Sequence, residues 1–98
     1  MIKINISKNK IKITGHAMYD DYGKDIVCAA VSSIVTTSVN LALRLNKNSL
    51  KYKMNGETLE IDIISYDLVT DTIILNMKEL LKDLEKQYSK NIKINEEV

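Results

Sequence analysis

The sequence predicts an α+β fold in the order ββαββαβ, with two helices packed on one face of a mostly antiparallel sheet. Two pairs of segments alternate apolar and polar residues as β-hairpins do, and two longer segments have helical features. A length of 98 residues, of which 45% are hydrophobic, suits one modest core. We therefore expect residues 1–98 to form a single domain.

The first hairpin is indicated by isoleucines near the N-terminus. They alternate with polar residues over 2–6 and again over 11–13, on either side of a polar turn. Because successive side chains of a strand point to opposite faces, all five isoleucines share one face. Gly15 and His16 are expected to end the second strand.

A long helix is predicted from about Asp25 to Arg44. Asp25 is interpreted as its N-cap. Seven β-branched residues lower its intrinsic helicity, so packing must hold it. The run from Ile26 to Leu43 has no charge, but a third of it is polar, which favours a buried central helix over a membrane span.

A second hairpin, a second helix and a last strand complete the fold. Apolar residues alternate over 50–54 and 59–63, and Asn55-Gly56 between them is a strong two-residue turn signal. Over 73–88 apolar residues recur at helical spacing, with charges on the opposite face. Residues 91–95 alternate again, which predicts an edge strand.

Composition excludes several classes of protein. Fourteen basic and thirteen acidic residues leave a net charge of +1, so we expect no direct nucleic-acid partner. One cysteine cannot form an intrachain disulfide, and the N-terminus lacks the pattern of a secretory signal, so a cytoplasmic protein without a membrane partner is expected. One histidine and one cysteine are too few for a structural zinc site, and no glycine-rich phosphate loop occurs. We expect neither a metal nor a cofactor.

The single histidine and the single cysteine, His16 and Cys28, are twelve positions apart. With Asp25 as the N-cap, Cys28 is the third helical residue, where unpaired N–H groups and the helix dipole favour a thiolate. His16 could then act as its base. The alternative is that Cys28 is a small core residue and His16 an unrelated strand-end residue.

Three nearby residues could support such a pair. Asp25 could orient His16 in addition to capping the helix, or only cap it. Ser32, one turn after Cys28, could bond the thiolate or bond back to a carbonyl of its own helix. Gly15 could permit a close approach of substrate or simply end the strand.

The segment from Ala17 to Gly23 is predicted to be a mobile loop with Gly23 as its hinge. Tyr19 and Tyr22 could line a substrate cleft or pack over the end of the sheet. Asp20 and Asp21 could attract a basic stretch of substrate or be solvated only.

Gly15-His16-Ala17, followed after a short loop by residues 23–32 (GKDIVCAAVS), resembles the signature of the ribosomal-processing cysteine protease family, often called Prp. The resemblance is strong over about eighteen residues. It implies that His16 and Cys28 are the catalytic dyad and that Gly15, Asp25 and Ser32 support it. The first hairpin is shorter here than in some relatives, which leaves substrate contacts from that hairpin open.

The resemblance also implies a function. It implies a bacterial cytosolic endopeptidase, usually a homodimer, that removes a short N-terminal extension from the precursor of the large-subunit ribosomal protein numbered twenty-seven. Such precursors are cut after aromatic residues and before a basic segment, which suits an apolar cleft edged by Asp20 and Asp21. Two alternatives remain: a non-catalytic ribosome-associated binding module with an inert buried cysteine, and a thiol hydrolase or transferase for small molecules.

Overall fold

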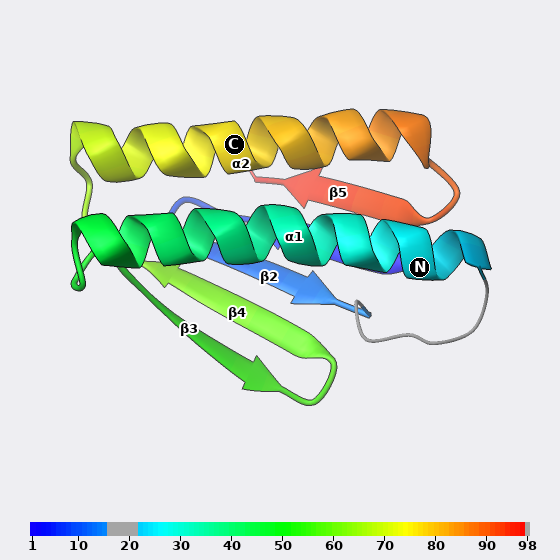
Figure 1. Cartoon of the computed structure of the whole chain (residues 1–98), viewed down its shortest axis with the longest axis horizontal. Helices are drawn as coiled ribbons and strands as arrows, with labels where there is room; N and C mark the ends of the chain where they lie inside the picture. Colours follow the sequence, from blue (N-terminus) through cyan, green and yellow to red (C-terminus); the bar gives the residue numbers. More distant parts are fainter. Residues whose placement is uncertain (16–21, 98) are drawn as a thin grey trace.

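The computed structural model describes residues 1–15 and 22–97, and in the second range it describes side chains from Ile26 onward. Within these residues, helices α1 (Tyr22–Leu45) and α2 (Leu68–Gln87) lie side by side on one face of a sheet (Figure 1). The strands are β1 (Ile2–Ile6), β2 (Lys10–Thr14), β3 (Leu50–Asn55), β4 (Thr58–Ile63) and β5 (Ile92–Glu96). Their spatial order is β3-β4-β2-β1-β5.

The β1–β5 pair is parallel, and the pairs β1–β2, β2–β4 and β3–β4 are antiparallel. The predicted α+β class and the order ββαββαβ are therefore confirmed. β5 lies at one edge beside β1, so the chain ends by pairing with the strand that begins it.

The β1–β2 hairpin has the predicted apolar face. In register, Ile4 lies opposite Ile13 and Ile6 opposite Ile11, and all four side chains are buried. The polar residues between them lie on the other face, which the helices do not cover. Period-two alternation thus decides which face of the sheet receives the helices.

Helix α1 begins at Tyr22, so the prediction that Asp25 is its N-cap was wrong. Asp25 is the fourth residue of the helix, and Cys28 is the seventh rather than the third. The prediction relied on the preference of Asp for N-cap positions, but each residue added to a helix end gains a backbone hydrogen bond, and no proline stops the helix at residues 22–24. Tyr22 and Gly23, predicted to be in the loop, belong to the first turn.

One face of α1 is buried. Val27, Val31, Val35 and Val39 follow one another along that face and pack into the core. Ile26–Leu45 has a mean hydropathy of 1.9 and is long and apolar enough to cross a membrane, although only 39% of that window is buried. Since the core helix of a soluble protein passes the same test, length and composition alone are weak evidence for a membrane span.

The hairpin β3–β4 turns one residue later than its sequence signal suggests. Asn55 is the last residue of β3 and pairs with Thr58, so Gly56 and Glu57 form the turn. Gly56 has a φ of +64° at the first central position, as a type II′ turn requires. The hairpin projects from beneath α1, beyond the layer of the helices (Figure 1).

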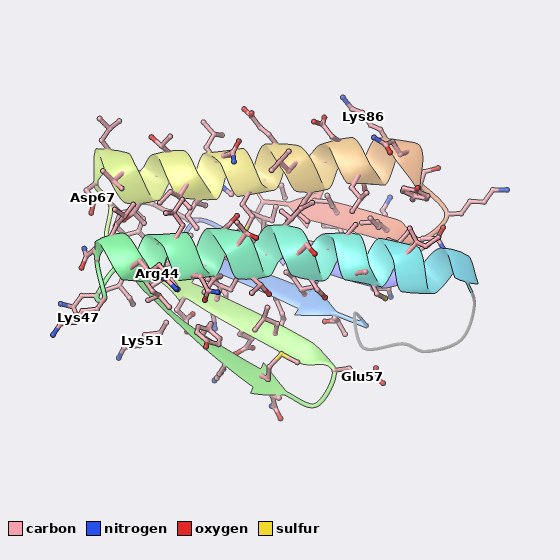
Figure 2. The ribbon with its side chains drawn as sticks, in the orientation of Figure 1. Arg44, Lys47, Lys51, Glu57, Asp67 and Lys86 are labelled. Carbon is pink, nitrogen blue, oxygen red and sulfur yellow. The ribbon has the colours of Figure 1, made fainter. Side chains whose placement is uncertain are left out.

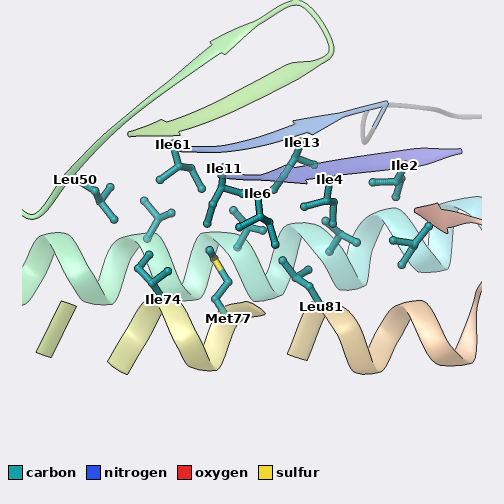
Figure 3. Packing of buried hydrophobic residues seen from close by; sticks show 14 of the residues in the cluster. Ile2, Ile4, Ile6, Ile11, Ile13, Leu50, Ile61, Ile74, Met77 and Leu81 are labelled. Atoms are coloured by element: carbon teal, nitrogen blue, oxygen red, sulfur yellow. The ribbon is translucent and has the colours of Figure 1, made fainter. Parts of the chain in front are cut away.

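Helix α2 begins with a cap that the periodicity did not reveal. The carboxylate of Asp67 accepts a hydrogen bond of 2.8 Å from the Thr70 N–H, and Asp67 lies at the start of the helix (Figure 2). Such a cap stabilises a helix by about 1 kcal/mol. Ile74, Met77 and Leu81 of α2 point into the core toward the sheet (Figure 3). Burial of each such side chain contributes about 1.5–3 kcal/mol.

Candidate active site

Cys28 is a buried residue of α1, in the second turn of the helix. Its side chain is 9% exposed and belongs to the same core cluster as Val27 and Val31. It is a free thiol. The thiol is therefore held by packing on a rigid helix, with little surface open to solvent.

The true start of α1 changes the electrostatics predicted for this thiol. The unpaired N–H groups of a helix are those of its first four residues, which here are residues 22–25. The amide of Cys28 lies inside the helix, and its side chain leans toward the preceding turn. Because the dipole effect falls off within the first turn, the helix stabilises a thiolate at Cys28 less than the predicted third position would.

Gly15 follows the last residue of β2 and has a backbone conformation that favours glycine. Its φ is +84°, and its N–H donates a 3.2 Å hydrogen bond to the carbonyl of Glu57. Glu57 lies at the tip of the β3–β4 hairpin (Figure 2). Gly15, the residue before His16, is therefore hydrogen-bonded to this hairpin.

Ser32 lies one turn after Cys28 and is half-buried. It lines a small cavity of about 40 Å³ between α1 and the sheet, together with Ile13 of β2, Leu59 of β4 and Thr36 of α1. A space of this size holds a water molecule or a small group. The structure thus places Ser32 beside a cavity rather than in the solid core.

The remaining predicted site residues lie outside the described residues, wholly or in their side chains. His16, Tyr19, Asp20 and Asp21 lie wholly outside them. For Tyr22, Gly23 and Asp25 the structure describes the helical backbone alone. What it brings to one end of the sheet is Gly15, the cavity beside Ser32, and the turn of α1 that carries Cys28.

Two contributors to this region were not predicted from the sequence. Leu59 was assigned only to a return strand, yet it lines the cavity beside Ser32. Glu57 had no signal, because its backbone carbonyl, and not its side chain, contacts Gly15. Ser32 and Leu59 are 27 positions apart and Gly15 and Glu57 are 42 positions apart, so local sequence patterns could not reveal either contact.

An α+β domain with a free thiol on its central helix, one turn before a residue that lines a cavity, is compatible with a small thiol-dependent enzyme. Solved structures point the same way. The ribosomal processing protease Prp of Staphylococcus aureus, in complex with a substrate peptide, has a TM-score of 0.84 and 27% identity, covering 99% of this chain and 100% of that chain. A structure of the same protease with a covalently linked product peptide gives 0.87 and 26%, with the same coverage.

Sequence comparisons identify the same relatives. The ribosomal processing cysteine protease Prp of S. aureus is 33% identical over 104 aligned positions, which cover 97% of this chain and 98% of the relative. The protein of that name from Mycoplasma genitalium is 60% identical over 35 residues, 36% of this chain and 35% of the relative. The family model of the cysteine protease Prp matches residues 1–93. This chain belongs to that family.

Proposed function

We propose that this protein removes the N-terminal extension from the precursor of the large-subunit ribosomal protein numbered twenty-seven, with Cys28 as the nucleophile and His16 as the general acid and base. The observation that carries the proposal is the free thiol of Cys28, one helical turn before the cavity that Ser32 lines, in a fold shared with proteases that hold substrate and product peptides. The location proposed is the bacterial cytoplasm, where ribosomal precursors are made and a lone thiol stays reduced.

In the proposed mechanism the Cys28 thiolate attacks the scissile carbonyl, and His16 protonates the leaving amine. Water activated by the same imidazole then hydrolyses the thioester. Because Cys28 is the seventh residue of α1, stabilisation of the thiolate falls more to His16 than to the helix dipole. The backbone donors proposed for the oxyanion are the unpaired amides of residues 22–25, one turn before Cys28.

Other residues have supporting roles in this proposal. Gly15 shapes the backbone before His16, and Ser32 fixes the Cys28 side chain from one turn away. Tyr19, Tyr22 and Gly23 are proposed to contact the peptide as the loop closes over it. Asp20 and Asp21 attract the basic segment that follows the scissile bond.

The test is cleavage of the precursor by the purified protein. Cys28→Ala and His16→Ala should each lower the cleavage rate by at least about a thousandfold, as loss of a catalytic dyad member does. Ala29→Ser, an exposed neighbour on the same helix, is the control and should cleave normally. Circular dichroism should show that all three variants are folded. Full activity of Cys28→Ala would rule out the proposed mechanism.

Two further measurements separate the alternatives. A precursor with a scrambled extension should not be cut, whereas a thiol hydrolase for small molecules would not distinguish the two precursors. Rapid alkylation of Cys28 by iodoacetamide at neutral pH is expected of a catalytic thiolate. An unreactive thiol together with an uncut precursor would instead support the non-catalytic binding module.

We also propose that two copies associate through the outer face of the helices. A groove of about 580 Å³ lies between α1 and α2, and its apolar lining is Ile34, Leu41, Ile73 and Leu80. The rest of its lining is uncharged. The side chains of Leu41 and Leu80 are 47% and 43% exposed. The same helix face of a second copy would cover them in a symmetric dimer.

A further inference from the structure

The face of the sheet that the helices do not cover, called here the open face, carries only polar side chains within its five strands. Six are lysines, two are carboxylates, and the other five are asparagine or threonine. They are Lys3 and Asn5 of β1, Lys10, Lys12 and Thr14 of β2, Lys51, Lys53 and Asn55 of β3, Thr58, Glu60 and Asp62 of β4, and Lys93 and Asn95 of β5. Glu97, just past β5, continues this face, so the excess of positive charge on it is three.

Folding thus gathers positive charge that the composition does not reveal. The whole chain has a net charge of +1, and that average is the reason why no direct nucleic-acid partner was expected from composition. With an excess of three positive charges on the open face, the rest of the chain has a net charge of −2. Charge gathered on one face attracts a ligand of opposite sign even when the net charge is small.

The two carboxylates of the strands lie in one half of the open face. The carboxylate of Glu60 lies 3.5 Å from the Lys12 ammonium and 3.3 Å from that of Lys53, and the carboxylate of Asp62 lies 3.5 Å from the Lys10 ammonium. All of these residues belong to β2, β3 and β4. The strands of the other half, β1 and β5, bring no carboxylate to this face.

Lys3 and Lys93 lie side by side in that other half. They are register partners of the parallel pair β1–β5, and both are exposed. Neither forms an ion pair with a carboxylate of the described residues. Like charges directly opposite each other on neighbouring strands are destabilising, and an anion bound between them would remove the repulsion. The lysine pair therefore points to a negatively charged ligand.

Asn5 and Asn95 form the next row of the same half. They are register partners too, and the Asn95 amide donates a 3.4 Å hydrogen bond to the Asn5 side-chain oxygen. Together with Lys10 and Lys12 they line a hollow of about 250 Å³, whose one acidic lining residue is Glu97. An asparagine side chain both donates and accepts hydrogen bonds, as a ribose 2′-hydroxyl does.

We propose that the open face binds RNA through its phosphate and ribose groups, with Lys3, Lys93, Asn5 and Asn95 as the main contacts. The strands place no aromatic side chain on this face to stack a base, so binding does not depend on the base sequence. A membrane fits less well, because the face has no apolar side chain to insert. The choice of RNA among polyanions rests on the proposed function, because the precursor of a ribosomal protein is destined for a particle that contains RNA.

The lysine pair lies at the end of the sheet that leads to the candidate active site. Lys3 is the register partner of Thr14, the last residue of β2, and Gly15 follows Thr14. RNA bound at Lys3 and Lys93 would lie at this end of the sheet, on the face opposite α1. It would therefore leave the helix that carries Cys28 uncovered.

The experiment measures binding of a fluorescein-labelled RNA hairpin by anisotropy, at about 50 and about 200 mM salt. The wild type should bind, and its affinity should fall steeply with salt because each lysine–phosphate contact releases a counterion. Lys3→Gln/Lys93→Gln should weaken binding at the lower salt by at least about tenfold and reduce the slope of log K against log salt by about two. An RNA hairpin of unrelated sequence should bind as the first does.

A matched double variant controls for the loss of charge itself. Lys47→Gln/Lys86→Gln removes two exposed lysines from outside the open face and should bind as the wild type does (Figure 2). The thermal unfolding midpoint of Lys3→Gln/Lys93→Gln should not fall, because that variant removes a like-charge pair. A DNA hairpin of the same sequence should bind more weakly than the RNA, since it lacks the 2′-hydroxyls.

The proposal is overturned if the wild type does not bind the RNA hairpin, if Lys3→Gln/Lys93→Gln binds it as tightly, or if the control variant weakens binding equally. Equal binding of the DNA hairpin, or tighter binding of phosphatidylglycerol vesicles, overturns the choice of RNA. Failure of the protease function looks different. In that case the wild type leaves the free precursor uncut, while RNA binding still depends on Lys3 and Lys93.

Discussion

At the scale of single residues, Cys28 and Ser32 show how a free thiol is placed within a packed core. Cys28 has valine neighbours in the core cluster, whereas Ser32, one turn later, borders an open cavity. A half-buried hydroxyl next to a thiol costs desolvation unless it makes a hydrogen bond. We expect this bond to form with the thiolate or with bound substrate.

Ser32→Ala should therefore lower the cleavage rate by about tenfold, the effect of losing one hydrogen bond to a charged group. Ser33→Ala is the matched control, because Ser33 is the next residue and is exposed. Steady-state cleavage of the precursor measures both. Equal rates for the two variants would show that Ser32 only fills space.

At the scale of elements, charged side chains join α2 to the edge strand β5. Lys82 donates a 2.6 Å hydrogen bond to the carboxylate of Glu96, and Lys78 lies 3.5 Å from it. Glu85 of α2 accepts a 2.7 Å bond from the Ile94 N–H, which satisfies a donor of this edge strand. The Glu85 contact thus pairs one backbone donor of an edge that would otherwise leave it to solvent.

The pKa of Glu96 is lowered, first by the hydrogen bond from Lys82 and then by the positive charges of Lys82 and Lys78. A lowered pKa in the folded state stabilises the protein above the unfolded pKa of about 4.5, and this stability is lost as the pH falls through the folded pKa. Glu96→Gln should thus lower the unfolding free energy by a few tenths of a kcal/mol at neutral pH, because the pair is partly exposed.

Urea unfolding at neutral pH and at about pH 3 measures this effect. The difference between wild type and Glu96→Gln should shrink at the lower pH and in high salt. Glu97→Gln, at the next position and exposed, should show no such difference. A Glu96→Gln effect that persists unchanged in acid would contradict the assigned cause.

At the scale of the whole molecule, the two helices leave an uncharged groove between them. α1 carries no charge from Ile26 to Leu43, and its outward Leu41 adjoins Leu80 of α2 at one groove. A charged side chain at the centre of an interface between two copies would remain buried without a partner, which strongly weakens association.

Leu41→Lys should therefore convert a dimer to a monomer in analytical ultracentrifugation. Leu75→Lys is the control: Leu75 is 57% exposed on α2 but lines a different cavity, so this variant should stay dimeric. A wild type that sediments as a monomer, or a Leu41→Lys protein that stays dimeric, would contradict the proposed interface.

Local sequence patterns predicted most of the helices and strands but not the residues at which they begin and end. The isoleucines of β1 and β2 could be assigned because period-two alternation is a property of the chain itself. The predicted start of α1 was wrong by three residues. Asp25 has the side chain of a typical N-cap, but the helix already begins at Tyr22. The turn after Asn55 was shifted by one residue, because Gly56 alone needs the positive φ.

The sequence by itself determined the element order and the buried faces, and it predicted the pair His16 and Cys28, because spacing and residue type are local quantities. Only the tertiary structure decided that the Gly15 N–H donates a hydrogen bond to the carbonyl of Glu57 in the hairpin, and that Ser32 and Leu59 line one cavity. The physical reason is that a cavity or groove forms where one element leaves part of its neighbour uncovered. That depends on how α1 and the β3–β4 hairpin pack, which no single segment specifies.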